Sequence, residues 1–102
     1  MLQPTAGQKI PRSDVITDVF LAALEEAGVV EAWLFGSFSR GDEGPESDVD
    51  LLVKFGRDVP LFERLRIADQ LSRIAGRHVD LLVDIEPVFD PYIRPTLIPI
   101  PL

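Results

Sequence analysis

Two short segments of this chain are nearly alike, and each combines a strand pattern with acidic residues. They are Asp48-Val-Asp-Leu-Leu-Val-Lys-Phe and His78-Val-Asp-Leu-Leu-Val-Asp-Ile. Both are rich in β-branched and large apolar residues, and both are too short for a stable helix. Their similarity predicts two neighbouring central strands of one sheet, each with an acid at its third position.

Two other segments have the periodicity of helices. An apolar stripe predicts a helix over residues 14–27, with Ser13 as the cap of its first turn and Gly28 at its end. A second stripe begins at Pro60, which suits the start of a helix, and ends at Gly76. Each helix has one apolar face that another layer must cover.

A further strand is predicted over residues 29–35, because this run is β-branched and aromatic and is bounded by glycines. The order helix, strand, strand, helix, strand predicts an α+β domain, a small mixed β-sheet with helices packed on it. We divide the chain into a loose N-terminal leader (1–12), one folded domain (13–86) and a proline-rich apolar tail (87–102).

The tail has prolines at positions 87, 91, 95, 99 and 101. Because each proline removes a backbone donor, the tail is predicted to be extended or irregular, and neither a helix nor a central strand. It is too apolar for a solvated tail, so we expect it to pack on this domain or on a partner. Its large apolar residues are Val88, Phe89, Tyr92, Ile93, Leu97, Ile98, Ile100 and Leu102.

The amino-acid composition and the start of the chain indicate the cell compartment in which this protein is expected. The absence of cysteine excludes disulfides and zinc–thiolate sites and fits a reducing compartment. The start of the chain, MLQPTAGQKIPRSD, contains no long apolar stretch, which argues against a signal peptide or membrane anchor. We therefore expect a soluble, cytoplasmic protein that does not bind membranes. Its 46% of hydrophobic residues can form one core without disulfide or metal staples.

The net charge limits the classes of ligand that this chain is expected to bind. A net charge of -7 argues against long DNA or RNA, whose binders gain affinity by neutralising phosphates with Lys and Arg. A single nucleotide can still bind an acidic protein when divalent cations bridge carboxylates to phosphates.

Asp48 and Asp50 are two positions apart on a predicted strand, so their side chains leave the same face. The residues between and after them, Val49, Leu51 and Val53, would point into the core. Two readings fit this pattern, an ordinary amphipathic strand with a solvated polar face and a cation site. Asp80, on the neighbouring predicted strand, would add a third carboxylate and favour a site for a hard cation, although an acid at a strand end also faces water.

Gly36 and Ser37 follow directly on the predicted strand 29–35. A glycine there permits close approach of the backbone, and a serine hydroxyl with its amides can meet a phosphate, although such pairs are usually turns. Arg40 could reach the same phosphate or pair with a nearby acid of the loop. Ser47 precedes the acids and could cap or turn the loop, and His78, without a nucleophile nearby in sequence, is assigned a structural role.

The stretch Gly36-Ser-Phe-Ser-Arg-Gly-Asp-Glu-Gly-Pro-Glu-Ser-Asp-Val-Asp-Leu-Leu-Val resembles the signature of the DNA polymerase β-like nucleotidyltransferase superfamily. It has a Gly-Ser pair, an Arg-Gly and then Ser-Asp-x-Asp, and Asp80 stands where a third carboxylate is expected. Residues 13–86 look most like the minimal nucleotidyltransferases, such as the antitoxin member of two-gene HEPN toxin modules. The resemblance implies the polymerase β-like nucleotidyltransferase fold.

The resemblance also implies roles for single residues. Gly36 and Ser37 would bind the triphosphate of ATP, with Arg40 and Ser47 as further nucleotide-binding candidates. The catalytic carboxylates Asp48, Asp50 and Asp80 would hold two Mg²⁺ ions. Asp80 would also help to activate the attacking hydroxyl.

From these roles we expect an enzyme that transfers AMP from ATP to a hydroxyl of a partner protein. The partner would be a HEPN-type toxin or another acceptor protein, in a homo- or hetero-oligomer, and this chain would be its antitoxin. The alternative is a non-catalytic antitoxin or binding module that neutralises its partner by occlusion. An antibiotic nucleotidyltransferase is disfavoured, because no second domain is present to hold such a substrate.

Overall fold

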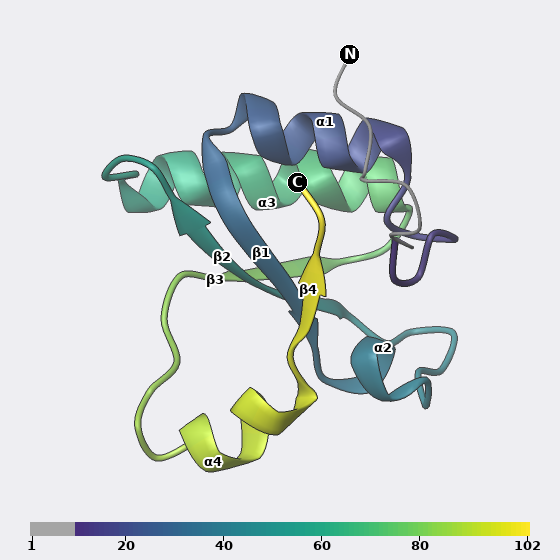
Figure 1. The fold of residues 1–102 in the computed structure, drawn as a ribbon. Helices are drawn as coiled ribbons and strands as arrows, with labels where there is room; N and C mark the ends of the chain where they lie inside the picture. The colour runs from purple at the N-terminus through teal and green to yellow at the C-terminus, as the bar shows by residue number, and fades with distance from the viewer. Residues whose placement is uncertain (1–9) are drawn as a thin grey trace.

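The computed structural model describes residues 10–102, so most of the predicted leader lies outside the described residues. Helices and strands alternate along the chain and form a sheet with helices packed against it (Figure 1). In chain order the elements are α1 (Asp18–Glu26), β1 (Val29–Phe35), α2 (Ser37–Arg40), β2 (Val49–Phe55), α3 (Leu61–Ala75), β3 (Val79–Leu82), α4 (Asp90–Ile93), η1 (Arg94–Thr96) and β4 (Ile98–Ile100).

The four strands form one mixed sheet in the order β3-β2-β1-β4. β1 runs antiparallel to β2 and to β4, whereas β2 and β3 are parallel. The predicted α+β class, with a small mixed sheet, is therefore confirmed, as is the adjacency of the two similar segments. The prediction that both are central strands was wrong for β3, which within residues 10–102 pairs only with β2 and so lies at the edge.

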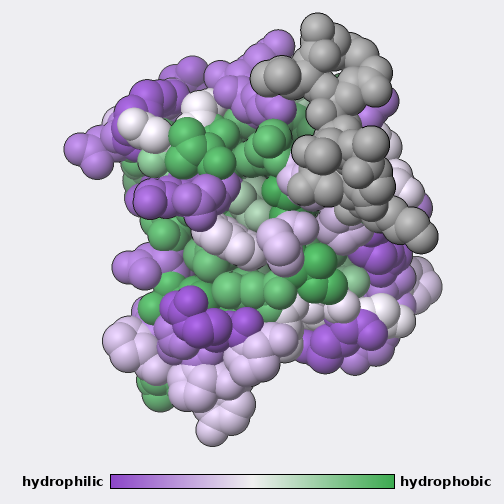
Figure 2. Space-filling model, in the orientation of Figure 1, coloured by the Kyte–Doolittle hydropathy of each residue, from purple (hydrophilic) through white to green (hydrophobic). Residues whose placement is uncertain are grey.

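α1 and α3 pack on each other and cover one face of the sheet (Figure 1). The residues of β2 that point toward them, Val49, Leu51 and Val53, are each no more than 1% exposed. The alternate residues of the strands therefore point to the opposite, helix-free face. On the side seen in Figure 2, hydrophobic surface lies between hydrophilic rims. Among the described helices, none combines the length and apolarity needed to cross a bilayer.

α1 begins later than predicted. Arg12 has a positive φ of 52°, and its carbonyl accepts hydrogen bonds from the amides of Val15 and Ile16 at 2.9 and 2.8 Å, which closes a turn before the helix. Thr17, and not Ser13, is the N-cap, because its hydroxyl accepts a hydrogen bond from the Phe20 amide at 3.2 Å. The apolar stripe predicted here consists of Val15, Ile16, Val19, Phe20, Ala23 and Leu24, and all of these are buried except Val19, which is 64% exposed.

α3 has the predicted limits. Pro60 precedes it, and Gly76 ends it in the left-handed conformation at φ 73°, where a side chain would be strained. The Ser72 hydroxyl near its end accepts a hydrogen bond from the Val79 amide at 2.9 Å. This bond fixes the start of β3 against the end of α3.

The tail contains regular structure, contrary to the prediction. Pro91 and Pro95 occupy first turns of α4 and η1, where the missing amide has no partner to lose. Pro99 lies in β4, an edge strand that pairs with β1 and so tolerates proline. Ile100 is only 4% exposed and completes the core, whereas Phe89 and Tyr92 remain 54% and 78% exposed.

Candidate active site

Asp50 and Asp80 are partners in the register of the parallel strands β2 and β3. Register partners point to the same side of a sheet, and the residues flanking Asp50, Val49 and Leu51, are buried under the helices. Both carboxylates therefore lie on the helix-free face. This agrees with the prediction that Asp80 lies on the strand next to that of Asp50.

Asp48, His78 and Asp80 form a cluster at the start of these strands. One potential ligand atom from each lies within 4.8 Å of the others. His78 Nε2 is 3.7 Å from Asp80 Oδ1, and both side chains are more than half exposed. The His78 carbonyl also accepts a hydrogen bond from the Val49 amide at 2.9 Å, which joins the two strand starts.

His78 was not predicted as a site residue. The signal was present in the sequence, because His78 precedes Asp80 by two positions as Asp48 precedes Asp50. With the strands parallel and in register, this spacing places Asp48 and His78 at neighbouring positions.

Asp50 is the least exposed of the three acids. Burial is the largest cause that raises its pKa, followed by the negative charges of Asp80 and Asp48. The positive charge of Arg40 acts in the opposite direction. The charged form of Asp50 is therefore disfavoured, and a cation bound beside it would offset this effect.

Gly36 brings the backbone up against Asp50. It stands between β1 and α2 with φ 74° and ψ −150°, a conformation that side chains rarely adopt. A Cβ at this position would overlap Asp50 Oδ2 and lie 3.3 Å from Asp50 Cγ. Glycine is therefore required for α2, with Ser37 as its first residue, to start beside the carboxylate.

Arg40 and Ser47 make contacts within the loop. Arg40 Nε donates to Asp42 Oδ2 at 3.1 Å, and both side chains are more than half exposed. Ser47 Oγ accepts a hydrogen bond from the Gly44 amide at 2.8 Å and so closes a turn. These are the local roles that the sequence left open for both residues, and their contact with a nucleotide remains a prediction.

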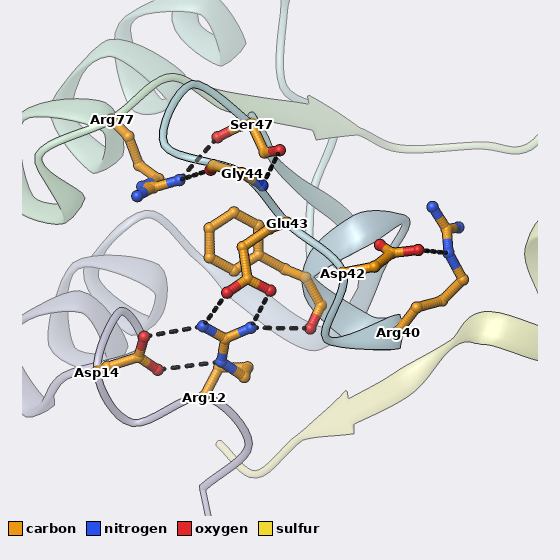
Figure 3. A network of polar contacts seen from close by, with 9 residues as sticks. Arg12, Asp14, Arg40, Asp42, Glu43, Gly44, Ser47 and Arg77 are labelled. Atoms are coloured by element: carbon orange, nitrogen blue, oxygen red, sulfur yellow. Dashed lines mark hydrogen bonds and ion pairs between the residues drawn. The ribbon is translucent and has the colours of Figure 1, made fainter.

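A polar network that the sequence did not predict surrounds α2 (Figure 3). Arg12 donates to both carboxylate oxygens of Glu43, at 2.6 and 2.9 Å, and to both of Asp14, at 3.1 and 2.9 Å. The pKa of the Arg12 guanidinium is raised by these bonds, and the pKa of each carboxyl is lowered by them. No local sequence pattern indicates the pair of Arg12 with Glu43, because these two residues are 31 positions apart in the chain.

The donor set fits magnesium. Three carboxylates on or next to two adjacent strands offer the oxygen ligands that this hard cation prefers, and after burial the charges of Asp80 and Asp48 contribute to the raised pKa of Asp50. The glycine at position 36 keeps one side of the Asp50 carboxylate open. A cation and a phosphate could therefore share this side of the sheet.

A shallow cavity of about 350 Å³ begins beyond Asp80. It is lined by Arg64 of α3 and by residues 81–87, which are the end of β3 and the segment after it. Within the described part of the chain, Arg64 Nε is buried there without a hydrogen-bond partner. The cavity thus offers a cationic side chain beside the end of β3.

Relatives with known names share this architecture. A 38% identical Methanocaldococcus jannaschii protein named as a candidate protein adenylyltransferase, MJ0435, matches over 54% of this chain and 59% of its own length. A solved structure described as a candidate minimal nucleotidyltransferase is 25% identical, has a TM-score of 0.72, and is covered over 99% of its length by 93% of this chain.

A third relative is a crystal structure of a toxin–antitoxin with AMP-PNP. It is 26% identical with a TM-score of 0.57, over 61% of this chain and 52% of that chain. The chain thus spans less than two thirds of the length of the curated relatives it matches first. The sequence profile of the nucleotidyltransferase domain matches residues 18–99, from α1 to β4. This chain therefore belongs to the nucleotidyltransferase domain family.

Proposed function

We propose that this chain transfers AMP from ATP to a hydroxyl group of a partner protein in the cytoplasm. The observation that carries the proposal is the register pairing of Asp50 with Asp80, beside a glycine that has no room for a side chain. The relatives support the class of reaction, since one is named as a candidate protein adenylyltransferase and another was solved with AMP-PNP.

Each site residue has a role in this proposal. Asp48, Asp50 and Asp80 hold two magnesium ions, and His78 stands close enough to contribute a further ligand. The backbone at Gly36 and the Ser37 hydroxyl face the triphosphate. Arg40 and Ser47 reach the nucleotide only if they leave their present partners in the loop.

Bound magnesium would supply positive charge at the entering and leaving oxygens of an in-line displacement. The acceptor hydroxyl oxygen forms a bond to the α-phosphorus of ATP, and the bond from that phosphorus to the bridging oxygen of the β-phosphate breaks. The hydroxyl loses its proton, toward Asp80 in this arrangement, and pyrophosphate leaves. In this proposal the three carboxylates and the backbone at Gly36 keep the reacting groups in line.

The acceptor is proposed to be a toxin of the HEPN type, with this chain as its antitoxin. The domain itself has little enclosed space for an acceptor, because its cavity beyond Asp80 is shallow. A protein that brings its own hydroxyl to the edge of β3 suits this geometry.

Occlusion of the partner is the second candidate function. It is favoured by the apolar side chains exposed after β3, among them Val88, Phe89 and Tyr92, which lie at least 54% exposed. Such a patch is typical of a protein contact. In this reading, binding alone silences the partner.

Co-expression with a HEPN-type toxin tests the two functions. With the wild-type chain, intact mass spectrometry of the toxin is expected to show additions of ~329 Da, one AMP for each modified hydroxyl. The double variant Asp48→Asn with Asp50→Asn should still bind the toxin and leave its mass unchanged. If the double variant neutralises the toxin as well as the wild type does, and the toxin is unmodified in both, occlusion replaces transfer.

A further inference from the structure

The ring of Phe38 lies between two guanidinium groups. Arg12 is 4.8 Å from the ring centroid and Arg77 is 4.9 Å from it, and Phe38 is only 2% exposed. Arg77 lies just after α3, so the stack ties that turn to α2 and to the segment before α1. A cation over the face of a desolvated ring is attracted by the ring quadrupole.

Arg77 also holds the loop between α2 and β2. Its Nη1 donates to the carbonyl of Ser47 at 3.1 Å and to the carbonyl of Gly44 at 3.3 Å (Figure 3). Residues 42–48 contain neither helix nor strand, so side-chain contacts of this kind define their path. On the other side of the loop, the guanidinium of Arg12 donates hydrogen bonds to both carboxylate oxygens of Glu43.

Two of the three contacts of Arg77, with Phe38 and with Ser47, fall next to the two halves of the site. Phe38 directly follows Ser37, which faces the triphosphate in the proposed function, and Ser47 directly precedes Asp48. We propose that Arg77 is a positioning residue, which sets the spacing between the phosphate-binding residues at the start of α2 and the carboxylate of Asp48. This inference rests on the proposed nucleotide transfer.

Arginine suits this role and lysine does not. The guanidinium is planar, so it stacks on the ring while its edge donates to the two carbonyls. A lysine ammonium keeps the charge and loses the flat stacking face. The inference therefore predicts that geometry, and not charge alone, determines activity.

The test compares Arg77→Met and Arg77→Lys with Arg73→Met. Arg73 is a matched control, because it lies one turn earlier, is 81% exposed and pairs only with Asp69. Amide hydrogen exchange of residues 41–48 should become faster in Arg77→Met and stay unchanged in Arg73→Met. For nucleotide transfer, Arg77→Met should lower kcat ~30-fold and change KM for ATP less than ~3-fold, since a misplacement of about 1 Å costs ~100-fold.

Arg77→Lys should recover only part of this loss. Ile67→Val, which removes one methylene from the core, serves as a stability control and should keep the wild-type kcat below its melting temperature. An Arg77→Met enzyme with wild-type kcat and exchange would overturn the inference, as would equal losses in Arg73→Met or full activity in Arg77→Lys. If the wild type itself transfers no AMP, the proposed function fails, which is a different result.

Discussion

Asp50 on β2 and Asp80 on β3 are direct neighbours across a parallel pair of strands, on the face of the sheet without helices. Burial and this neighbouring charge raise the pKa of Asp50. A carboxyl whose pKa is raised by folding destabilises the fold once the pH exceeds its ordinary value of about 3.9, where the unfolded chain ionises first. In the absence of a cation, the position of Asp50 therefore lowers the stability of the fold at neutral pH.

Asp50→Asn should therefore stabilise the chain at pH 7 in the presence of a chelator. The expected gain in melting temperature is ~2–5 °C, and it should vanish below pH 4, where both states are protonated. Thermal melting as a function of pH measures it, with the exposed Asp58→Asn as a control. A lower melting temperature for Asp50→Asn at pH 7 would show that the carboxylate is stabilised by contacts within the chain.

Magnesium together with ATP should stabilise the fold more than either ligand alone, since the cation offsets the carboxylate repulsion and also bridges to the phosphates. At ~100 times the dissociation constant the complex adds ~2.7 kcal/mol to the free energy of unfolding. The melting temperature measured with magnesium alone, with ATP alone and with both ligands tests this prediction. Equal shifts in wild type and Asp50→Asn would place the ligand elsewhere.

Gly36→Ala should destabilise the fold by ~1–3 kcal/mol through its backbone conformation alone, and more because the new Cβ meets the Asp50 carboxylate. Gly41→Ala is the matched control, since Gly41 also has a positive φ, 77°, and has free space around it. Both variants should lose stability in denaturant titration, and only Gly36→Ala should lose binding of magnesium with ATP. Normal binding by Gly36→Ala would remove Gly36 from the site.

The variant Glu43→Gln tests whether the ion pair with Arg12 stabilises the loop between α2 and β2. The bond to Arg12 lowers the pKa of Glu43, so the pair stabilises the fold above the ordinary carboxyl pKa of about 4.3, and this contribution is lost as the pH falls. The variant should melt earlier than wild type at pH 7 and equally at pH 3. Asp42→Asn, which breaks the more exposed pair with Arg40, should have a smaller effect. A larger effect of Asp42→Asn would contradict this ranking.

Phe89→Asp with Tyr92→Asp should weaken binding of the partner ~10-fold or more without lowering the melting temperature, because both side chains are exposed. Calorimetric titration of the partner measures the affinity. Truncation after Glu86 is a poorer test, since it removes β4 and the buried Ile100 from the domain. Unchanged affinity of the double variant would show that the partner binds another surface.

Local patterns were sufficient for the central part of the fold. Strand β1 and helix α3 have their predicted limits because glycines bound the first, and Pro60 and Gly76 bound the second. The alternation around Asp50 correctly placed Val49 and Leu51 in the core, because a strand with one buried face has only one register that hides its apolar residues.

Contacts between distant segments explain the errors. Arg12, which pairs with the distant Glu43, closes a turn with its carbonyl where α1 was predicted to start, and pairing with β1 made a strand of a proline-rich segment. Arg77 has no sequence signal for its role, since its partners are an aromatic ring and two backbone carbonyls.

Transfer of labelled phosphate from ATP to the purified partner measures the central claim most directly. The chain, magnesium and the partner are incubated with ATP labelled either at the α-phosphate or at the γ-phosphate. Transfer of AMP predicts a partner labelled from the α-phosphate alone, and no label with the Asp48→Asn and Asp50→Asn double variant. Label from the γ-phosphate, or equal α-label with the double variant, would contradict the assignment of these carboxylates to nucleotide transfer.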